Sequence, residues 1–274
     1  MTARPFIETF NTHRMRPEVV RALATGRERE LEEVMITIRQ AVSQPGVHPQ
    51  HMVVYGERGS GKSFLMRLVQ LEVEDLAKAQ DATVACVLLP EEQYNIRSES
   101  RLIEAITAEL LGSGGTFSYA FDGREPSIAW EEALQSLNDA LDARFGPGKG
   151  LLIAGVENFD TLAKQLFGAG TDMKSKRAGQ QRAAEERLRK LMNTRNARFL
   201  LLATATGTVD MDYERPLFQA FKPIDLTPWS GDTCIDYFNR RRELEQAPAL
   251  SSVEIARARA ITEFIGGNPG WRNC

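Results

Sequence analysis

Residues 56–63 read Gly56-Glu57-Arg58-Gly59-Ser60-Gly61-Lys62-Ser63 and match the pattern G-x-x-x-x-G-K-[ST] in full. Because glycine makes up roughly 7% of residues in proteins, a chance match in a chain of this length is on the order of one in a hundred. The short apolar run from Met52 to Tyr55 precedes the pattern, and apolar residues at helical spacing follow it. A buried strand, a glycine-rich turn and a helix in this order predict a phosphate-binding loop.

Each residue type in this loop has a physical task. Glycines let backbone N–H groups turn toward phosphate oxygens, and the N-terminus of the following helix adds a partial positive charge. Lys62 is expected to reach the β- and γ-phosphates of a nucleotide, and the Ser63 hydroxyl is expected to ligate Mg²⁺. The whole segment from Gly56 to Ser63 is therefore the predicted site for the phosphates of a nucleoside triphosphate.

The composition of the 274-residue chain is ordinary for a globular protein, with 42% hydrophobic and 26% charged residues. Disordered and fibrous chains depart from these values. The formal net charge of −3 gives no general preference for nucleic acid. No apolar stretch has the roughly 18 residues of a membrane span. Charged residues near the N-terminus argue against a secretion signal, and three widely spaced cysteines argue against a disulfide framework. We therefore expect a cytoplasmic protein with no membrane partner.

Apolar runs alternate with helical patterns along the first 228 residues. Five runs are typical of buried strands, and they are residues 52–55, 83–89, 151–156, 198–203 and 221–226. This alternation predicts an α/β fold with a parallel five-stranded sheet between helices. Beyond Pro228 the pattern is helical, around residues 232–246 and 251–265. We therefore expect a nucleotide-binding α/β domain over residues 1–228 and a partial helical lid over residues 229–274.

Two shorter patterns carry local predictions. The segment Thr25-Gly26-Arg27-Glu28 has the spacing of a capping box, which predicts that a helix starts there. His48 and His51 have the spacing H-x-x-H, but no third ligand lies at metal spacing. We therefore expect both histidines to belong to a surface turn.

Acidic residues follow the predicted strand 151–156. Glu157 comes directly after it and Asp160 three residues later. A carboxylate at this place can hold Mg²⁺ opposite Ser63, and a second one can orient the attacking water. The chain has neither the D-x-x-G nor the N-K-x-D pattern of GTPases, which favours ATP as the nucleotide. A small-molecule kinase is a less favoured alternative, since such kinases usually have no acid at the end of a later buried strand.

Together these motifs resemble the AAA+ and related STAND-type P-loop ATPases, most closely their origin-recognition-type and bacterial regulatory branches. The similar segments span most of the chain. They are residues 25–31, the Walker A segment 56–63, the Walker B segment 156–160, the sensor 1 strand 199–206, the segment 213–216 and the lid motif 266–272. The resemblance implies an ATPase that uses ATP and Mg²⁺. The catalytic residues that it implies are Glu157, Asp160, Thr204 and Arg215.

The resemblance also assigns a role to each motif. Thr204, as sensor 1, would reach the γ-phosphate or its attacking water. Arg215 would act as an arginine finger on the ATP of a neighbouring chain, which implies a homo-oligomer. Arg272, as sensor 2, would contact the nucleotide from the lid. Residues 25–31 would pack near the adenine.

The sequence departs from the family pattern at three places. Asn158 stands where the family has its catalytic glutamate, which implies slow hydrolysis unless Asp160 orients the water. Gly270 and Trp271 are inserted before Arg272 in the lid motif. The chain ends at Cys274, where a lid helix should begin. We therefore expect a truncated lid, with a partner-specific domain in the missing part.

Two functions fit these features. The first is an ATP-dependent oligomeric switch that acts on nucleic acid or on a protein partner. The second is a nucleotide-gated scaffold that hydrolyses little ATP, which Asn158 favours.

Residues 174–195 hold eight basic and two acidic residues, so they either contact nucleic acid or form a solvated helix face with Leu188 and Leu191 inward. The solvated face is preferred, because no aromatic residue interleaves the charges.

Overall fold

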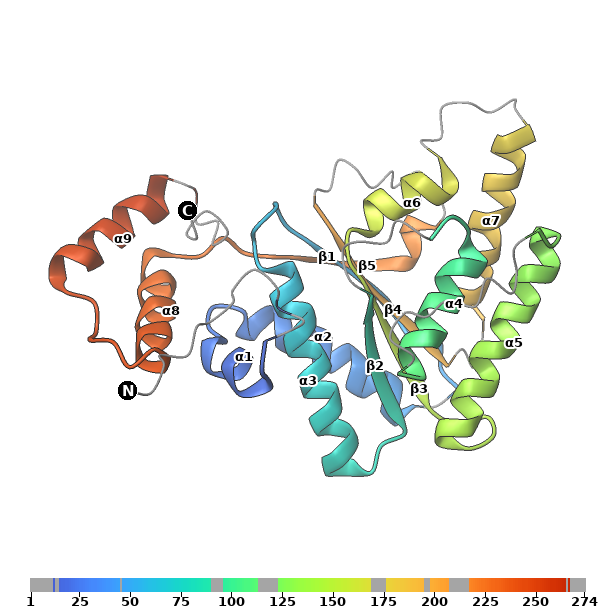
Figure 1. The fold of residues 1–274 in the computed structure, drawn as a ribbon, viewed down its shortest axis with the longest axis horizontal. Helices are drawn as coiled ribbons and strands as arrows, with labels where there is room; N and C mark the ends of the chain where they lie inside the picture. The colour runs from blue at the N-terminus through green and yellow to red at the C-terminus, as the bar shows by residue number, and fades with distance from the viewer. Residues whose placement is uncertain are drawn as a thin grey trace.

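Five parallel strands form one sheet in the part of the chain that the computed structural model describes (Figure 1). The described residues are 12, 15–44, 46–89, 96–112, 123–168, 176–194, 198–206, 217–264 and 266. The strands are β1 (His51–Tyr55), β2 (Val84–Leu89), β3 (Leu151–Val156), β4 (Phe199–Ala205) and β5 (Phe221–Asp225). Their spatial order is β2-β3-β4-β1-β5. The predicted α/β fold with a parallel sheet is confirmed, and the strands lie close to their expected bounds.

Helices cover both faces of this sheet. Helices α2 (Glu28–Ser43) and α3 (Lys62–Gln80) pack on one face, in a cluster that includes Val54 of β1. The cluster on the other face includes Val53 and four further helices. They are α4 (Glu99–Leu110), α5 (Pro126–Phe145), α6 (Phe159–Phe167) and α7 (Lys176–Met192). Because successive strand residues point to opposite faces, neighbours such as Val53 and Val54 enter separate cores.

The order of the strands determines which loops meet. Strand β4 lies between β1 and β3, with Thr204 opposite Val54 of β1. The carboxyl ends of parallel strands lie at the same edge of a sheet. The loops after β1, β3 and β4 therefore come together at one edge, and ligand sites of open α/β sheets lie outside this edge.

His51 begins β1 and does not lie in a surface turn, so that prediction is wrong. His51 is 1% exposed. Nε2 donates to the Met192 carbonyl oxygen at 2.8 Å, and Nδ1 accepts from the Leu201 N–H at 2.9 Å. Burial lowers the pKa of His51 from 6.5 to about 4, which makes the neutral ring the form present at neutral pH. The imidazole joins β1 to β4 and to the end of α7.

The N-terminal helix α1 (Pro17–Leu23) lies between the sheet helices and the last two helices. Its buried residues Val20 and Leu23 pack with α3 and with Tyr237 of α8 (Gly231–Leu244). Helix α9 (Ser252–Phe264) packs on α8, and both lie beside the sheet rather than on either of its faces (Figure 1). Residues 226–230 link β5 to α8, and the division into domains at residue 228 stays a prediction. None of the helices among the described residues is long and apolar enough to span a membrane.

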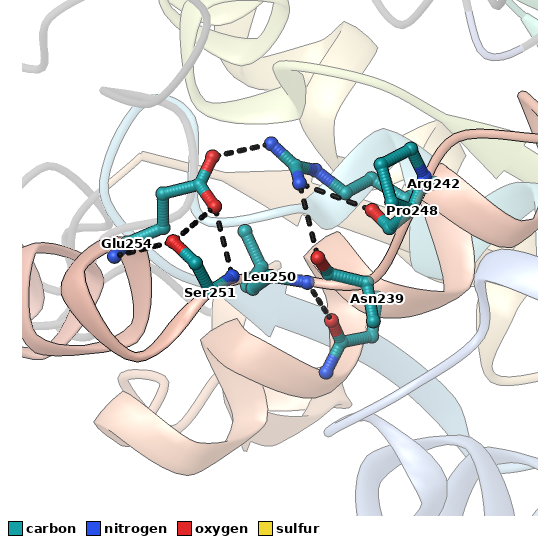
Figure 2. Close-up of polar contacts among 7 residues, drawn as sticks. Asn239, Arg242, Pro248, Leu250, Ser251 and Glu254 are labelled. Carbon is teal, nitrogen blue, oxygen red and sulfur yellow. Dashed lines mark hydrogen bonds and ion pairs between the residues drawn. The ribbon is translucent and has the colours of Figure 1, made fainter.

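A polar network closes the turn between α8 and α9 (Figure 2). The Glu254 carboxylate accepts from the Ser251 N–H at 2.8 Å, and the Ser251 hydroxyl accepts from the Glu254 N–H at 3.4 Å. Arg242 donates to the same carboxylate at 2.6 Å and to the Pro248 carbonyl oxygen at 3.0 Å. Hydrogen bonds from Ser251 and Arg242 lower the pKa of Glu254 to about 2. The start of α9 is therefore a reciprocal capping box with an added cation.

Helix α2 begins at Glu28, and its N-cap residue is Arg27, so the predicted capping box at Thr25 does not form. Instead the Gly26 N–H donates to the Glu28 carboxylate at 3.1 Å. Gly26 has a φ of +65°, and a Cβ there would come within 2.2 Å of the Thr233 side chain. The close approach of α8 therefore requires glycine in this turn.

Candidate functional site

The phosphate-binding pattern forms the loop between β1 and α3. The Ser60 N–H donates to the Glu57 carbonyl oxygen at 3.1 Å, and the Gly56 N–H reaches the end of β4 through the Ala205 carbonyl oxygen at 3.3 Å. Gly61 is the N-cap residue of α3 and has a φ of +95°. A residue with a side chain is strained at this angle, so glycine lets the loop turn into the helix.

Lys62 begins α3, and its side chain turns back over this loop. The Nζ atom donates to the carbonyl oxygens of Gly56 at 2.6 Å and of Glu57 at 2.9 Å. The residue is 8% exposed. The ammonium group and the N-terminal partial charge of α3 thus lie beside the same loop, where both favour an anion.

Ser63 and Glu157 are in direct contact. The Ser63 hydroxyl donates to Oε2 of Glu157 at 2.8 Å. Ser63 lies in the first turn of α3 and Glu157 directly follows β3, so the sheet brings the two motifs together. A hydroxyl and a carboxylate suit Mg²⁺, which usually takes one or two carboxylates together with substrate phosphates and waters. Among the described residues, no group of three or more His, Cys, Asp or Glu could hold a metal ion.

Two hydrogen bonds join the turn after β3 to the end of β4. The Asn158 N–H donates to Oγ1 of Thr204 at 3.0 Å, and the Thr206 N–H donates to Oδ2 of Asp160 at 3.1 Å. Thr204 is 1% exposed and Asp160 is 3% exposed. The buried Oδ1 atom of Asp160 has no hydrogen-bond partner within the described part of the chain. This carboxylate therefore keeps one acceptor oxygen free for a further donor.

The structure brings most of the predicted site residues to one edge of the sheet. The loop from Gly56 to Ser63, Glu157, Asp160 and Thr204 all lie at the carboxyl ends of β1, β3 and β4. Glu57 and Arg58 are exposed in this loop. Arg215 and Arg272 lie outside the described residues, and their places stay predictions.

Arg27 contacts the loop and was not predicted to do so. Its guanidinium donates from Nη2 to the Ser60 carbonyl oxygen at 2.8 Å and from Nη1 to the Thr227 carbonyl oxygen at 2.7 Å. The residue is 2% exposed. The spacing of residues 25–28 indicated only a helix start and, through the family resemblance, a place near the adenine.

The basic segment lies on α7, and it packs on the sheet with Leu188 and Met192 buried. Arg187 donates from Nε to Glu99 of α4 at 2.7 Å. Arg182, Arg189 and Lys190 are exposed. Lys174 and Arg195, together with the side chains of Lys176 and Arg177, lie outside the described residues.

Comparison with known proteins identifies the fold. No protein-family model and no curated protein sequence matches the chain. Solved structures match it, among them the Aeropyrum pernix ORC2 protein in its ADPNP-ADP complexes. The TM-score is 0.61 at 18% identity, over 89% of this chain and 59% of that one. The Aeropyrum pernix ORC1 protein in complex with DNA matches with a TM-score of 0.58 at 18% identity, over 83% and 52% of the two chains. The chain has an origin-recognition-type AAA+ fold.

A chain from a multiprotein complex also has a similar structure. A chain of the HORMA:CdnC:Trip13 complex of E. coli MS115-1 matches with a TM-score of 0.54 at 14% identity, over 91% of this chain and 77% of that one. The present chain spans only 52% and 59% of the two ORC chains. At these identities the likeness shows the AAA+ fold alone.

Proposed function

We propose that the chain binds ATP with Mg²⁺ and acts as a nucleotide-dependent switch with ATPase activity. The observation that carries the proposal is the 2.8 Å hydrogen bond between Ser63 and Glu157. It joins the phosphate loop to the acid after β3, and phosphoryl-transfer sites of this class place Mg²⁺ between these two motifs. The AAA+ fold supports the same assignment.

The loop binds the phosphates in this proposal. Its backbone N–H groups donate to phosphate oxygens, and the Lys62 ammonium exchanges its carbonyl partners for the β- and γ-phosphates. Ser63 and Glu157 would hold Mg²⁺, which would supply positive charge beside the phosphate oxygens. Arg272 contacts the nucleotide from the lid, as the family resemblance implies.

Asp160 is our candidate for orienting the attacking water. Its Oδ2 atom is fixed by the Thr206 N–H, and its second oxygen is buried with hydrogen-bonding capacity left. Thr204, which accepts from the Asn158 N–H, would act as sensor 1. Asp160→Asn should bind ATP and trap the bound state, while Asn158→Glu should leave turnover unchanged. Wild-type turnover of Asp160→Asn, together with faster turnover of Asn158→Glu, would move the role to position 158.

We propose a homo-oligomer in which Arg215 reaches the γ-phosphate of a neighbouring chain. The ORC1 neighbour was solved with DNA, and another neighbour is a chain of the HORMA:CdnC:Trip13 complex, which supports nucleic acid or a protein partner as the target. The exposed side chains of Arg189 and Lys190 on α7 support a nucleic-acid target. The opposite side of α7 packs on the sheet through Leu188 and Met192, which supports a structural role for that side.

A nucleotide-gated scaffold with little hydrolysis is the second candidate. Asn158 favours it, because an amide cannot take a proton from water as a carboxylate can. Asn158 is the N-cap residue of α6, and its backbone lies in the left-handed region at a φ of +47°. Tight ATP binding with phosphate release near background would support the scaffold and contradict the enzyme.

Titration calorimetry with ATP and Mg²⁺ tests the proposal. Lys62→Ala should abolish tight binding, because it removes the cation held at the loop, and it should leave the fold intact by circular dichroism. Lys78→Ala is the matched control, since Lys78 is exposed in the last turn of the same helix. An unchanged ATP affinity of Lys62→Ala would contradict the assignment of the phosphate site.

A further inference from the structure

Arg27 connects three segments that are far apart in the sequence. It precedes α2, its Nη2 group holds the Ser60 carbonyl of the phosphate loop, and its Nη1 group holds the Thr227 carbonyl of the linker 226–230. These two hydrogen bonds measure 2.8 Å to Ser60 and 2.7 Å to Thr227. One guanidinium therefore holds the loop and the linker at the same time.

The hydrogen bond to Ser60 fixes the direction of a phosphate-binding group. In a planar trans peptide, the carbonyl oxygen of one residue and the N–H of the next point in opposite directions. While Arg27 holds the Ser60 oxygen, the Gly61 N–H is directed away from Arg27. Backbone N–H groups of such loops are the donors to phosphate oxygens. Arg27 thus orients a backbone donor of the loop through the Ser60 carbonyl.

The linker is held through both backbone groups of Thr227. Its carbonyl oxygen accepts from Arg27, and its N–H donates to Oε1 of Glu30 at 3.0 Å. Glu30 forms a buried ion pair with Arg27, with 3.7 Å between Nη1 and Oε1. The Trp229 ring lies over the same guanidinium, 5.6 Å from its Cζ atom to the ring centroid. The linker is therefore fixed to the start of α2 before α8 begins.

Burial makes this arrangement specific for arginine. Desolvation lowers the pKa of Arg27, and the charge of Glu30 opposes this effect. A guanidinium presents several N–H donors in one rigid plane, whereas a lysine ammonium is a single point charge that cannot reproduce this fork. A Cβ on Gly61 would lie 3.8 Å from Nε of Arg27, so the side chain also packs against the loop.

We propose that Arg27 is a positioning residue that couples the phosphate loop to the linker of the last two helices. A phosphate bound at the loop restrains the peptide between Ser60 and Gly61, and through Arg27 it restrains residues 226–230. Such coupling is reciprocal, so displacement of the linker weakens nucleotide binding by the same factor. The inference rests on the proposed nucleotide binding and adds the route by which a nucleotide reaches α8 and α9.

Amide hydrogen exchange and calorimetry with ADP and Mg²⁺ test this coupling. In the wild-type chain, saturating ADP should slow exchange in the loop 56–63 and at residues 226–233. Arg27→Lys should bind ADP about tenfold or more weakly, because it loses charge-assisted hydrogen bonds. At saturating ADP, this variant should keep the protection of the loop and lose that of the linker. Arg39→Lys is the matched control, since Arg39 is an exposed arginine on α2, the helix that Arg27 precedes.

The outcomes separate the coupling from the function on which it rests. A wild-type chain that binds no ADP would refute nucleotide binding itself. Normal ADP binding with unchanged exchange at residues 226–233 would overturn the coupling alone. The coupling would also be overturned if Arg27→Lys keeps the wild-type affinity for ADP and the wild-type protection of the linker. If Arg27→Lys does not fold, the wild-type exchange measurement decides the question, because it needs no substitution.

Discussion

Glu157 is the residue on which the magnesium assignment depends. Glu157→Gln keeps an oxygen that can accept from the Ser63 hydroxyl and removes the negative charge that favours a cation. Mg²⁺-dependent phosphate release should therefore fall strongly, because the metal loses a direct carboxylate ligand. The thermal midpoint without Mg²⁺ should stay near that of the wild type.

A magnesium titration of phosphate release makes this measurement. Glu32→Gln provides the control, because Glu32 is a solvent-exposed acid paired with Arg39 on α2. If Glu157→Gln hydrolyses ATP like the wild type at every magnesium concentration, Glu157 does not hold the metal.

At the residue scale, the sequence predicted those contacts that follow from motif spacing. Ser63 and Glu157 were paired because each ends a recognisable strand-to-loop pattern, and the structure joins them. Arg27 was missed because its partners lie 33 and 200 residues away, and no local periodicity reports such contacts. The buried contact of Asp160 with Thr206 was missed for the same reason.

Strand β1 depends on a histidine that must stay neutral. The pKa of His51 is about 4 in the folded chain, against 6.5 in an unfolded one. Below pH 6.5 the unfolded chain takes up a proton that the folded chain refuses, so the free energy of unfolding decreases as the pH falls from 6.5 toward 4. This group alone should account for a loss of about 3 kcal/mol.

Urea denaturation at a series of pH values in this range measures the effect. His51→Gln removes the titrating ring, so its stability should depend less steeply on pH in this window. His48→Gln, whose ring lies 5.7 Å from that of His51, should keep most of the wild-type slope. Equal slopes for wild type and His51→Gln would show that other groups control the acid sensitivity.

Helix α9 depends on its cap more than on its core, because Thr262 is its one buried residue. Glu254→Gln weakens the bonds from Ser251 and Arg242 (Figure 2), so the amides of residues 252–264 should exchange faster. Since the pKa of Glu254 is lowered to about 2, this contribution is present near neutral pH and is lost as the pH falls through that value.

Exchange of α9 in Glu254→Gln should be compared with that in Glu263→Gln, which changes an exposed acid of the same helix. The strands should show wild-type exchange in both variants. Identical α9 exchange in the two variants would mean that the network does not stabilise the helix.

Assembly belongs to the scale of the whole molecule. If Arg215 acts on the ATP of a neighbouring chain, ATP should promote oligomers visible by light scattering, and turnover per chain should rise with protein concentration. Arg215→Ala should lower turnover by roughly 10³–10⁵-fold with little change in nucleotide affinity. Mixing it with Lys62→Ala should restore part of the activity, because one chain supplies the loop and the other the arginine. A monomer at saturating ATP, with turnover independent of concentration, would exclude this mechanism.

The architecture was predictable because each strand is a short apolar run between turn residues, and alternation with helices selects a parallel sheet. The order β2-β3-β4-β1-β5 did not follow from the residues, since buried strands such as β3 and β4 have no polar face to fix their neighbours. The place of α1 against α3 and α8 was likewise missed, because seven residues carry too short a pattern.

The ring of Trp229 gives this protein a natural optical probe. It lies beside a buried cation and packs on Tyr237 of α8, with ring centroids 5.3 Å apart. Indole emission responds to nearby charge and to solvent. A shift of the linker would therefore change the intensity and the wavelength of the Trp229 emission without any attached dye. Trp130 is a buried residue of α5, and replacing both Trp130 and Trp271 with phenylalanine would leave Trp229 as the single tryptophan of the sequence. The linker 226–230 can therefore be followed in real time by the fluorescence of Trp229.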